Sequence, residues 1–159
     1  MIRPVQQSDF DFIYKLYMHP EVNPYLLYEH MDKESFAPIF AELLRDGVLY
    51  VFSEQGEDIG MCKLIRLKHR TSHIAYLGGV AIDPAKAGKG YAHAMFSEII
   101  ALGQSMQLAR IELSASVENL RAIRLYEKCG FEREGILRRY TYLRSEDRYL
   151  DEVLMSYLY

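Results

Sequence analysis

Apolar residues recur every three or four positions in four stretches of the chain, a spacing that predicts amphipathic helices. These stretches span residues 10–19, 32–46, 91–103 and 120–129. Ser8-Asp9 and Asn119 precede two of them, with side chains that can cap the first free N–H groups of a helix. Gly47 and Gly130 follow two of them and predict where those helices end.

Shorter apolar runs between these helices predict β-strands at residues 2–5, 48–53, 59–67, 73–82, 110–116, 131–143 and 148–158. Turn residues at 55–58 and 144–147 join neighbouring runs into two hairpins. Gly78-Gly79 lies inside one run, and paired glycines within a strand indicate a bulge or a close backbone approach. The order β-α-α-β-β-β-α-β-α-β-β predicts a mixed sheet with helices on its faces, an α/β or α+β fold.

Composition is that of an ordinary globular protein, with 159 residues, 50% apolar and 26% charged, enough for one domain. A net charge of −3 gives no general basic field for nucleic acid or anionic membranes. Without a long apolar run or an apolar signal segment, we expect a cytoplasmic protein. In that compartment we expect Cys62 and Cys129 to be reduced thiols. The histidines are scattered and do not have the spacing of metal ligands.

A glycine-containing loop at residues 80–92 carries the first chemical signal and reads V-A-I-D-P-A-K-A-G-K-G-Y-A. A strand that leads through glycines into a helix presents free N–H groups at the positive helix end, a site for phosphate. Neither common phosphate motif fits, because Gly90 follows Lys89 where a P-loop needs a hydroxyl, and His93 stands where a dinucleotide fingerprint needs glycine. A tight turn without a ligand is the alternative interpretation.

The loop is followed at residues 117–131 by V-E-N-L-R-A-I-R-L-Y-E-K-C-G-F, and together these blocks resemble the GNAT superfamily of acyl-CoA-dependent N-acyltransferases. The family's loop signature is Q/R-x-x-G-x-G/A; here Gly90 and Ala92 match it, while Ala87 replaces the usual Gln or Arg. The resemblance runs from about residue 49 to the C-terminus. The ending E-G-I-L-R-R-Y-T-Y is similar to the bacterial branch that acetylates small amines, amino acids or protein N-termini.

This resemblance implies one N-acetyltransferase domain over residues 1–159, with a mixed, mostly antiparallel sheet of six or seven strands and about four helices. It also implies acetyl-CoA as co-substrate and no metal. The implied acetyl-CoA-binding residues are Val80, Ala81, Ile82, Gly88, Lys89, Gly90, Tyr91, Ala92, His93 and Asn119. Residues 88–93 would hold the pyrophosphate with backbone N–H groups, and residues 80–82 would pair the pantetheine arm like an added strand.

An N–H of residues 80–82 would also stabilise the thioester oxygen as it becomes an oxyanion. Some of these side chains have a simpler interpretation. Lys89 and His93 are equally well read as solvated surface residues, and Asn119 as a helix cap alone.

The resemblance assigns to Tyr126 the protonation of the departing CoA thiolate. Tyr126 also falls on the apolar stripe of its helix, so a packed core tyrosine is the alternative, and Cys129 one turn later reads as core. The strand at 76–82 contains no carboxylate to accept the amine proton. Glu112 on the next strand is the candidate base, acting through water, and its alternative role is an ion pair with Arg110 or a neighbour.

The acceptor is expected between the first two helices and the closing hairpin, beside Tyr25, Tyr28, Glu29, Arg138 and Tyr140. Tyrosines with an acidic residue suit an amine, and an arginine suits a carboxylate. A solvated tyrosine-rich surface is the alternative. The sequence therefore predicts an N-acetyltransferase that acetylates a primary amine directly, whether a small amine, an amino acid or a peptide N-terminus. A non-catalytic acyl-CoA-binding sensor or interaction module is the second hypothesis, and monomer and homodimer both remain open.

Overall fold

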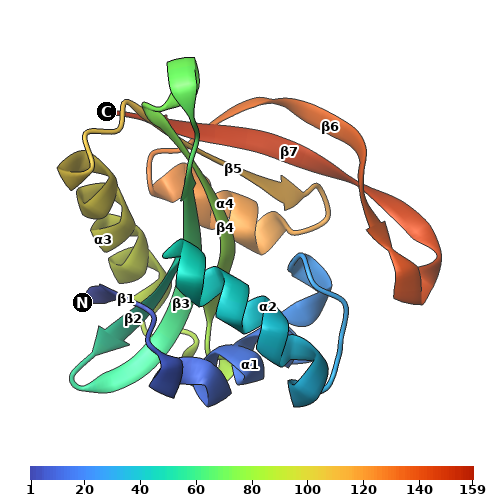
Figure 1. Cartoon of the computed structure of the whole chain (residues 1–159). Coiled ribbons are helices and arrows are strands. Elements are labelled where there is room, and N and C mark those ends of the chain that lie inside the picture. Colours follow the sequence, from blue (N-terminus) through green and yellow to red (C-terminus); the bar gives the residue numbers. More distant parts are fainter.

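The computed structural model describes all residues from Met1 to Tyr159 and contains one seven-stranded sheet with the order β1-β2-β3-β4-β5-β7-β6 (Figure 1). The strands are β1 (Ile2–Pro4), β2 (Leu49–Glu54), β3 (Glu57–Arg66), β4 (Ile74–Ile82), β5 (Arg110–Ser116), β6 (Glu132–Leu143) and β7 (Arg148–Leu158). Neighbouring strands are antiparallel except β4 and β5, which are parallel. The prediction of a mixed, mostly antiparallel sheet is confirmed.

Four helices cover the two faces of this sheet: α1 (Phe10–Met18), α2 (Lys33–Asp46), α3 (Tyr91–Ser105) and α4 (Leu120–Lys128). Apolar side chains of α1 and α2 pack with one face of β2 and β3, and those of α3 and α4 pack with the opposite face. Alternation along β3 explains the two cores, since Met61 belongs to the first and Cys62 to the second. None of the helices has the length and apolarity to span a membrane.

Local capping sets the helix ends where the sequence predicts them. Asp32 accepts a hydrogen bond from the Ser35 N–H at 2.8 Å, and Asn119 accepts one from the Ala122 N–H at 3.3 Å. Gly47 ends α2 in the left-handed conformation with φ of 64°, which a residue with a Cβ rarely adopts. The predicted cap at Asn119 and the predicted helix end at Gly47 are confirmed.

The expected cap of α1 is wrong. The carboxylate of Asp9 accepts hydrogen bonds from the backbone N–H of Gln6 and from the guanidinium of Arg3, both at 2.7 Å. It therefore closes the 3-10 turn at Gln7–Asp9, and α1 follows without a side-chain cap. The half-buried Arg3, six positions earlier, competes successfully for this buried carboxylate.

The glycine pair predicted to form a bulge does so. β3 and β4 pair Met61 with Ala81 and Lys63 with Gly78, so Gly79 and Val80 lie opposite the single residue between Met61 and Lys63. Gly79 has φ of 55°, and a Cβ there would lie 2.8 Å from the Tyr17 hydroxyl. The bulge therefore requires glycine both for its conformation and for the close contact.

The central feature of the sheet is the separation of its two parallel strands. β4 pairs with β5 through only three residue pairs, which join Ile74–Tyr76 to Arg110–Glu112. β4 then continues to Ile82 and β5 continues to Ser116 without further pairing between them. The edge of β4 over residues 77–82 that faces β5 is consequently open, although it lies in the interior of the sheet.

Candidate active site

The glycine loop beyond β4 presents a run of free backbone donors. Gly88 and Gly90 have φ of 81° and 80°, and no chain atom lies within 4 Å of where a Cβ would be placed on either residue. The first helical hydrogen bond of α3 runs from Ala94 N–H to the Gly90 carbonyl at 3.1 Å, and no side chain caps the helix. The six consecutive N–H groups of residues 88–93 therefore have no acceptor within the chain. This arrangement suits an anion with several oxygens, such as a pyrophosphate.

Asp83 fixes the point at which this loop leaves β4, a role that the sequence reasoning did not assign. Its N–H donates to the Ile59 carbonyl at 2.8 Å, and its buried carboxylate accepts from the Ala85 N–H at 3.0 Å and from Lys15 at 2.7 Å. Burial alone raises the pKa of Asp83, but the Lys15 and Ala85 hydrogen bonds outweigh it and the net pKa is lowered. The Asp-Pro pair is a turn signal that points to this position.

Residues Val80, Ala81 and Ile82 combine buried or half-buried side chains with an available backbone edge. On one side of β4, Ala81 pairs with Met61 and Ile82 with Gly60. The opposite edge of residues 80–82, which faces β5, pairs with no strand. Their side chains contribute to the two cores. The free edge suits an extended group that adds to a sheet by backbone hydrogen bonds.

Tyr126 lies on α4 with its ring against the rings of Phe96 and Phe131, at centroid distances of 5.2 and 6.3 Å. Its hydroxyl forms no hydrogen bond within the chain. Burial raises the pKa of Tyr126, and the proximity of Tyr76 and Glu152 raises it further. The side chain is therefore both a core element and a protonated hydroxyl that lacks a partner.

Tyr76, Ser114 and Glu152 form a hydrogen-bonded row across β4, β5 and β7. The Tyr76 hydroxyl lies 3.3 Å from Ser114 Oγ, and Ser114 donates to Glu152 Oε2 at 2.5 Å. Thr141 donates to the other carboxylate oxygen of Glu152 at 2.9 Å. Because the Tyr126 pKa is sensitive to Tyr76 and Glu152, this row and the Tyr126 hydroxyl lie near one another. The row was not predicted from the sequence.

Glu112 lies on the same strand as Ser114 but in a different environment. Its carboxylate accepts a hydrogen bond from Arg110 Nε at 2.9 Å. Arg110 also pairs with Glu134, and these two carboxylates raise the pKa of the guanidinium. The ion pair with Arg110 is the alternative role that the sequence left open for Glu112.

The side chains expected to meet the acceptor lie on two separate segments. Tyr140 belongs to a bulge of β6, where residues 138–140 lie opposite the single residue Asp151 of β7. Tyr140 is close enough to Tyr76 to contribute to the raised pKa of that hydroxyl. Tyr28 lies on the loop before α2, half-buried, with its ring 5.2 Å from that of Tyr17.

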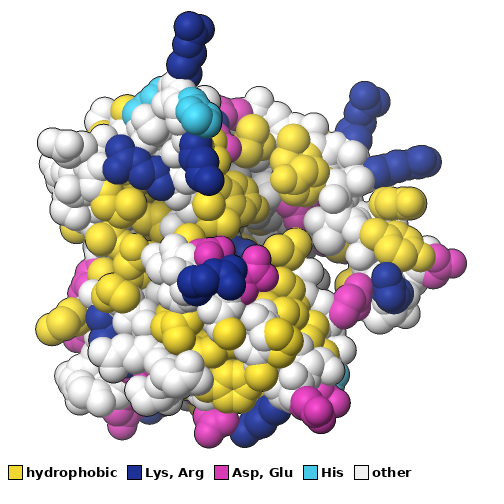
Figure 2. Space-filling view, in the orientation of Figure 1, with side chains coloured by type: hydrophobic (Ala, Val, Ile, Leu, Met, Phe, Trp, Pro, Cys, Tyr) yellow, Lys and Arg dark blue, Asp and Glu magenta, His cyan; other side chains and the backbone are white.

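Tyr25, Glu29 and Arg138 are exposed, and their side chains form no hydrogen bond or ion pair within the chain. The hairpin that carries Arg138 projects from the body of the molecule (Figures 1 and 2). The structure therefore brings Tyr140 to the polar row but gives these three side chains no hydrogen bond or ion pair.

Three residues predicted to bind acetyl-CoA remain: Lys89 in the glycine loop, His93 in the first turn of α3, and Asn119 before α4. Lys89 and His93 are exposed, and His93 Nδ1 lies 3.5 Å from the Sγ of the half-buried Cys129. The side-chain oxygen of Asn119 caps α4, while its amide nitrogen has no partner within the chain. No group of three or more His, Cys, Asp or Glu side chains is arranged to hold a metal ion.

Comparison with known proteins agrees with this geometry. Residues 10–131 match the model of the acetyltransferase (GNAT) family. The chain is 29% identical to the L-amino acid N-acetyltransferase AaaT of Escherichia coli K12, an alignment that covers 98% of this chain and 96% of that protein. It is 27% identical to the spermidine N(1)-acetyltransferase of Vibrio cholerae over 86% of this chain and 80% of that enzyme.

A similar solved structure is that of the spermidine N-acetyltransferase from Vibrio cholerae in complex with CoA and spermine. It superposes with a TM-score of 0.86 at 25% identity, covering 99% of this chain and 94% of that one. The shared fold is thus found in a protein whose solved structure contains CoA.

Proposed function

The chain belongs to the acetyltransferase (GNAT) family, and on this premise we propose that it transfers the acetyl group of acetyl-CoA directly to a primary amine. The six free N–H groups at residues 88–93, placed at the end of an open strand edge, carry the proposal. Because the seven strands from Ile2 to Leu158 form one sheet, the whole chain acts as one acetyltransferase domain. The acceptor class is a small amine, an amino acid or a peptide N-terminus.

The fit to acetyl-CoA rests on two features of the backbone. Residues 88–93 supply donors to the pyrophosphate, and the open space around Gly88 and Gly90 admits its oxygens. Residues 80–82 bind the extended pantetheine arm along the free edge of β4. A backbone N–H of this edge also stabilises the negative charge that develops on the thioester oxygen. The amide nitrogen of Asn119 adds a free donor at the start of α4.

Tyr126 acts as the general acid. The amine nitrogen forms a bond to the acetyl carbon, the carbon–sulfur bond breaks, and the thiolate takes the hydroxyl proton of Tyr126. The raised pKa of Tyr126 keeps that proton in place throughout the neutral pH range. The packing of the ring against Phe96 and Phe131 holds the hydroxyl in position.

Glu152 is the base that the structure favours over Glu112. Direct attack requires a neutral amine, and an attacking amine must lose a proton. Glu152 is hydrogen-bonded only by the Ser114 and Thr141 hydroxyls, so it carries no compensating cation, whereas Glu112 is paired with Arg110. We therefore assign the amine proton to Glu152, directly or through the Ser114 hydroxyl, and we assign Glu112 a structural role.

The acceptor enters on the face of the sheet that carries this polar row. Tyr140 borders the row from β6, and Arg138 and the loop residues Tyr25, Tyr28 and Glu29 form the outer approach. An acceptor on this face meets the thioester at the gap between β4 and β5. Tyr126 reaches the same gap from α4 on the other face.

A thiol-release assay with acetyl-CoA tests the proposal. We expect CoA release that depends on an added amine, measured over a panel of small amines, amino acids and short peptides. The acetylated product should appear without any acetylated protein in the mass spectrum, because the transfer is direct. Acetyl-CoA binding without turnover on any acceptor would contradict the proposal and favour a sensor.

A further inference from the structure

The hairpin of β6 and β7 extends past the end of β5 as an arm, which we define as residues 138–149 (Figures 1 and 2). Tyr142 pairs with Tyr149 across the arm, with ring centroids 5.0 Å apart, and both side chains are exposed, as is that of Tyr140. No apolar side chain of the arm belongs to either hydrophobic core. A two-stranded hairpin without a covering layer is only marginally stable in water, and exposed tyrosines are typical of interaction surfaces. The arm therefore has the character of a surface that binds a partner.

The arm also carries positive charge without a counter-charge. Its residues include four arginines and two acidic residues, on a chain whose net charge is −3. Both acidic side chains already have partners, since Glu146 pairs with Arg148 and Asp147 accepts a hydrogen bond from the Tyr142 hydroxyl. Three exposed arginines of the arm form no ion pair: Arg138, Arg139 and Arg144. The surface that complements the arm is therefore apolar and acidic.

The segment between α1 and α2 has this character. We call residues 19–34 the acidic loop, because they include four acidic residues against one lysine and two histidines. Two apolar side chains of the loop are strongly exposed, Tyr25 by 57% and Leu27 by 73%. Three exposed carboxylates of the loop form no ion pair: Glu21, Glu29 and Glu34. The loop thus offers apolar groups and free negative charges where the arm offers tyrosines and free positive charges.

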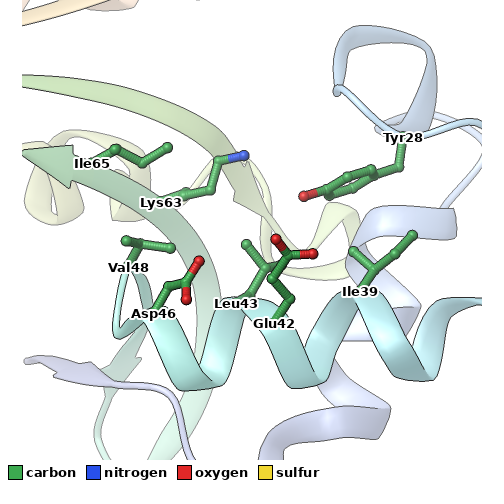
Figure 3. Close-up of a pocket in the computed structure, with 8 residues that line it drawn as sticks. All are labelled: Tyr28, Ile39, Glu42, Leu43, Asp46, Val48, Lys63 and Ile65. Carbon is green, nitrogen blue, oxygen red and sulfur yellow. The ribbon is translucent and has the colours of Figure 1, made fainter. Parts of the chain in front are cut away.

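The acidic loop is anchored from its inner side. The amide nitrogen of Asn23 donates to the carbonyls of Tyr17 and Tyr28 at 2.8 and 2.9 Å. Tyr28 borders a pocket of about 240 Å³ beneath the loop, where Nζ of the buried Lys63 lies 5.5 Å from the centroid of its ring (Figure 3). The outer surface of the loop is therefore preformed, which reduces the entropy lost when a partner binds.

The arm is held away from the acidic loop of its own chain. β7 runs from its pairing with β5 over residues 152–158 directly into the arm. At the base of the arm, Arg148 donates to both carboxylate oxygens of Glu118 at 2.9 and 3.0 Å, and the Val117 N–H donates to the Asp151 carbonyl at 3.0 Å. These contacts join the arm to the start of α4, which packs on the sheet face opposite α1 and α2. Bending the arm onto its own acidic loop would break them, whereas the loop of a second molecule can approach freely.

We propose that this protein forms a two-fold homodimer in which the arm of each chain docks on the acidic loop of the other. Each chain carries both complementary surfaces, so one two-fold axis forms the same contact twice and leaves neither surface over. The tyrosines of the arm cover the apolar side chains of the loop, and the free arginines meet the free carboxylates. The inference goes beyond the proposed acetyl transfer and does not depend on it, because neither surface contains Tyr126, Glu152 or residues 88–93.

Sedimentation velocity of the full chain tests the proposal, and we expect a dimer at micromolar concentration. One triple variant reverses the arm: Arg138→Glu, Arg139→Glu and Arg144→Glu. A second reverses the acidic loop: Glu21→Lys, Glu29→Lys and Glu34→Lys. Each variant places like charges opposite one another in both contacts, so the Kd of the dimer should rise by about 100-fold or more.

A mixture of the two triple variants is the decisive sample. In a heterodimer the negative arm of one variant meets the positive loop of the other, and the positive arm meets the negative loop. The mixture should therefore restore a dimer that neither variant forms alone, a result that closure of the arm within one chain cannot produce. The control reverses three exposed cations that form no ion pair and lie outside both surfaces, and it should remain dimeric: Lys68→Glu, Arg70→Glu and Arg121→Glu.

Circular dichroism checks that the variants fold, as expected for exposed positions. If charge reversal prevents folding, replacement of the same three arginines by Gln is milder and should still raise the Kd of the dimer. Three results would overturn the proposal: a monomeric wild type, a dimer that neither triple variant weakens, or a mixture that stays monomeric. Monomers in every sample would assign the arm to its own loop or to another macromolecule. Thiol release measured on the same samples separates the two proposals, since an inactive dimer would overturn only the transfer and an active monomer only the dimer.

Discussion

The ammonium nitrogen of Lys15 lies 2.7 Å from Oδ2 of Asp83, and this ion pair joins α1 to the start of the glycine loop. The carboxylate is almost fully buried, whereas the lysine is half exposed. Because Asp83 also receives the Ala85 N–H, one carboxylate holds both the helix and the turn that leads to residues 88–93. The geometry of the glycine loop therefore depends on the positive charge of Lys15, a residue of α1.

The Asp83→Asn variant should lose stability in a pH-dependent way. The folded-state pKa of Asp83 is lowered below the unfolded value of about 3.9. Its stabilisation is therefore fully present above that value and is lost as the pH falls through the folded pKa. We expect a deficit of about 1.5–3 kcal/mol at pH 7 that shrinks toward pH 3, measured by urea unfolding. Asp11→Asn is the control, since the Asp11–Lys33 pair has the same distance of 2.7 Å but is exposed; an equal deficit there would contradict the prediction.

Replacement of Gly90 should weaken acetyl-CoA binding. Gly90 and Gly56 share φ of 80°, and no chain atom is near the Cβ position of either. Gly90→Ala and Gly56→Ala therefore carry the same backbone strain of about 1–2 kcal/mol. Only the first places a methyl group among the donors of residues 88–93. By calorimetry we expect affinity to fall about tenfold or more for Gly90→Ala and to stay unchanged for Gly56→Ala; equal affinities would remove the loop from the binding site.

The Tyr126→Phe variant should lose turnover while keeping its fold and its affinity for acetyl-CoA. The ring still packs on Phe96 and Phe131, and only the acidic hydroxyl is removed. We expect kcat to fall by about 10²–10⁴-fold, the usual contribution of a general acid. Because the pKa of Tyr126 is raised, its loss of a proton should cause no decline in wild-type kcat below about pH 10. Tyr157→Phe is the control, since its ring also packs on Phe131; similar turnover in the two variants, measured where chemistry limits the rate, would show that Tyr126 is a core residue alone.

Glu152→Gln should impair the enzyme most at neutral pH. The amide preserves the size of the side chain but cannot accept the amine proton. We expect kcat/KM to fall by about 10²-fold at pH 7 and the deficit to shrink at high pH, where the acceptor amine is already neutral. Glu112→Gln is the matched variant, since Glu112 is paired with Arg110. A larger or more pH-dependent loss for Glu112→Gln would return the base to Glu112.

The boundaries of helices and strands were predictable because their signals are local. Asp32 and Asn119 cap helices through donors three residues away, and Gly47 ends α2 by its own conformation. β5 begins and ends where alternation predicts, at Arg110–Ser116. Each of these signals lies within a few positions of the feature it specifies.

The site was predictable only where one short motif contains it. Ser114 and Glu152 are 38 positions apart, and their contact depends on the register of β5 against β7, which no local pattern specifies. Lys63 looks like an exposed residue of a hairpin strand in the sequence, but in the structure the bulge at Gly79 and the helix α2 bury it. Long-range pairing and bulges therefore account for all three missed residues.

The open edge of β4 over residues 77–82 affects the stability of the folded protein as well as its chemistry. An unpaired edge inside a sheet is a place where the chain opens and where other strands add. In the proposed function, acetyl-CoA would close that edge as an extra strand and stabilise only the folded state, by an amount that grows with its concentration. We therefore expect slower amide hydrogen exchange in residues 77–82 and slower proteolysis as acetyl-CoA is added. On this proposal the lifetime of the folded protein should lengthen as the concentration of acetyl-CoA rises.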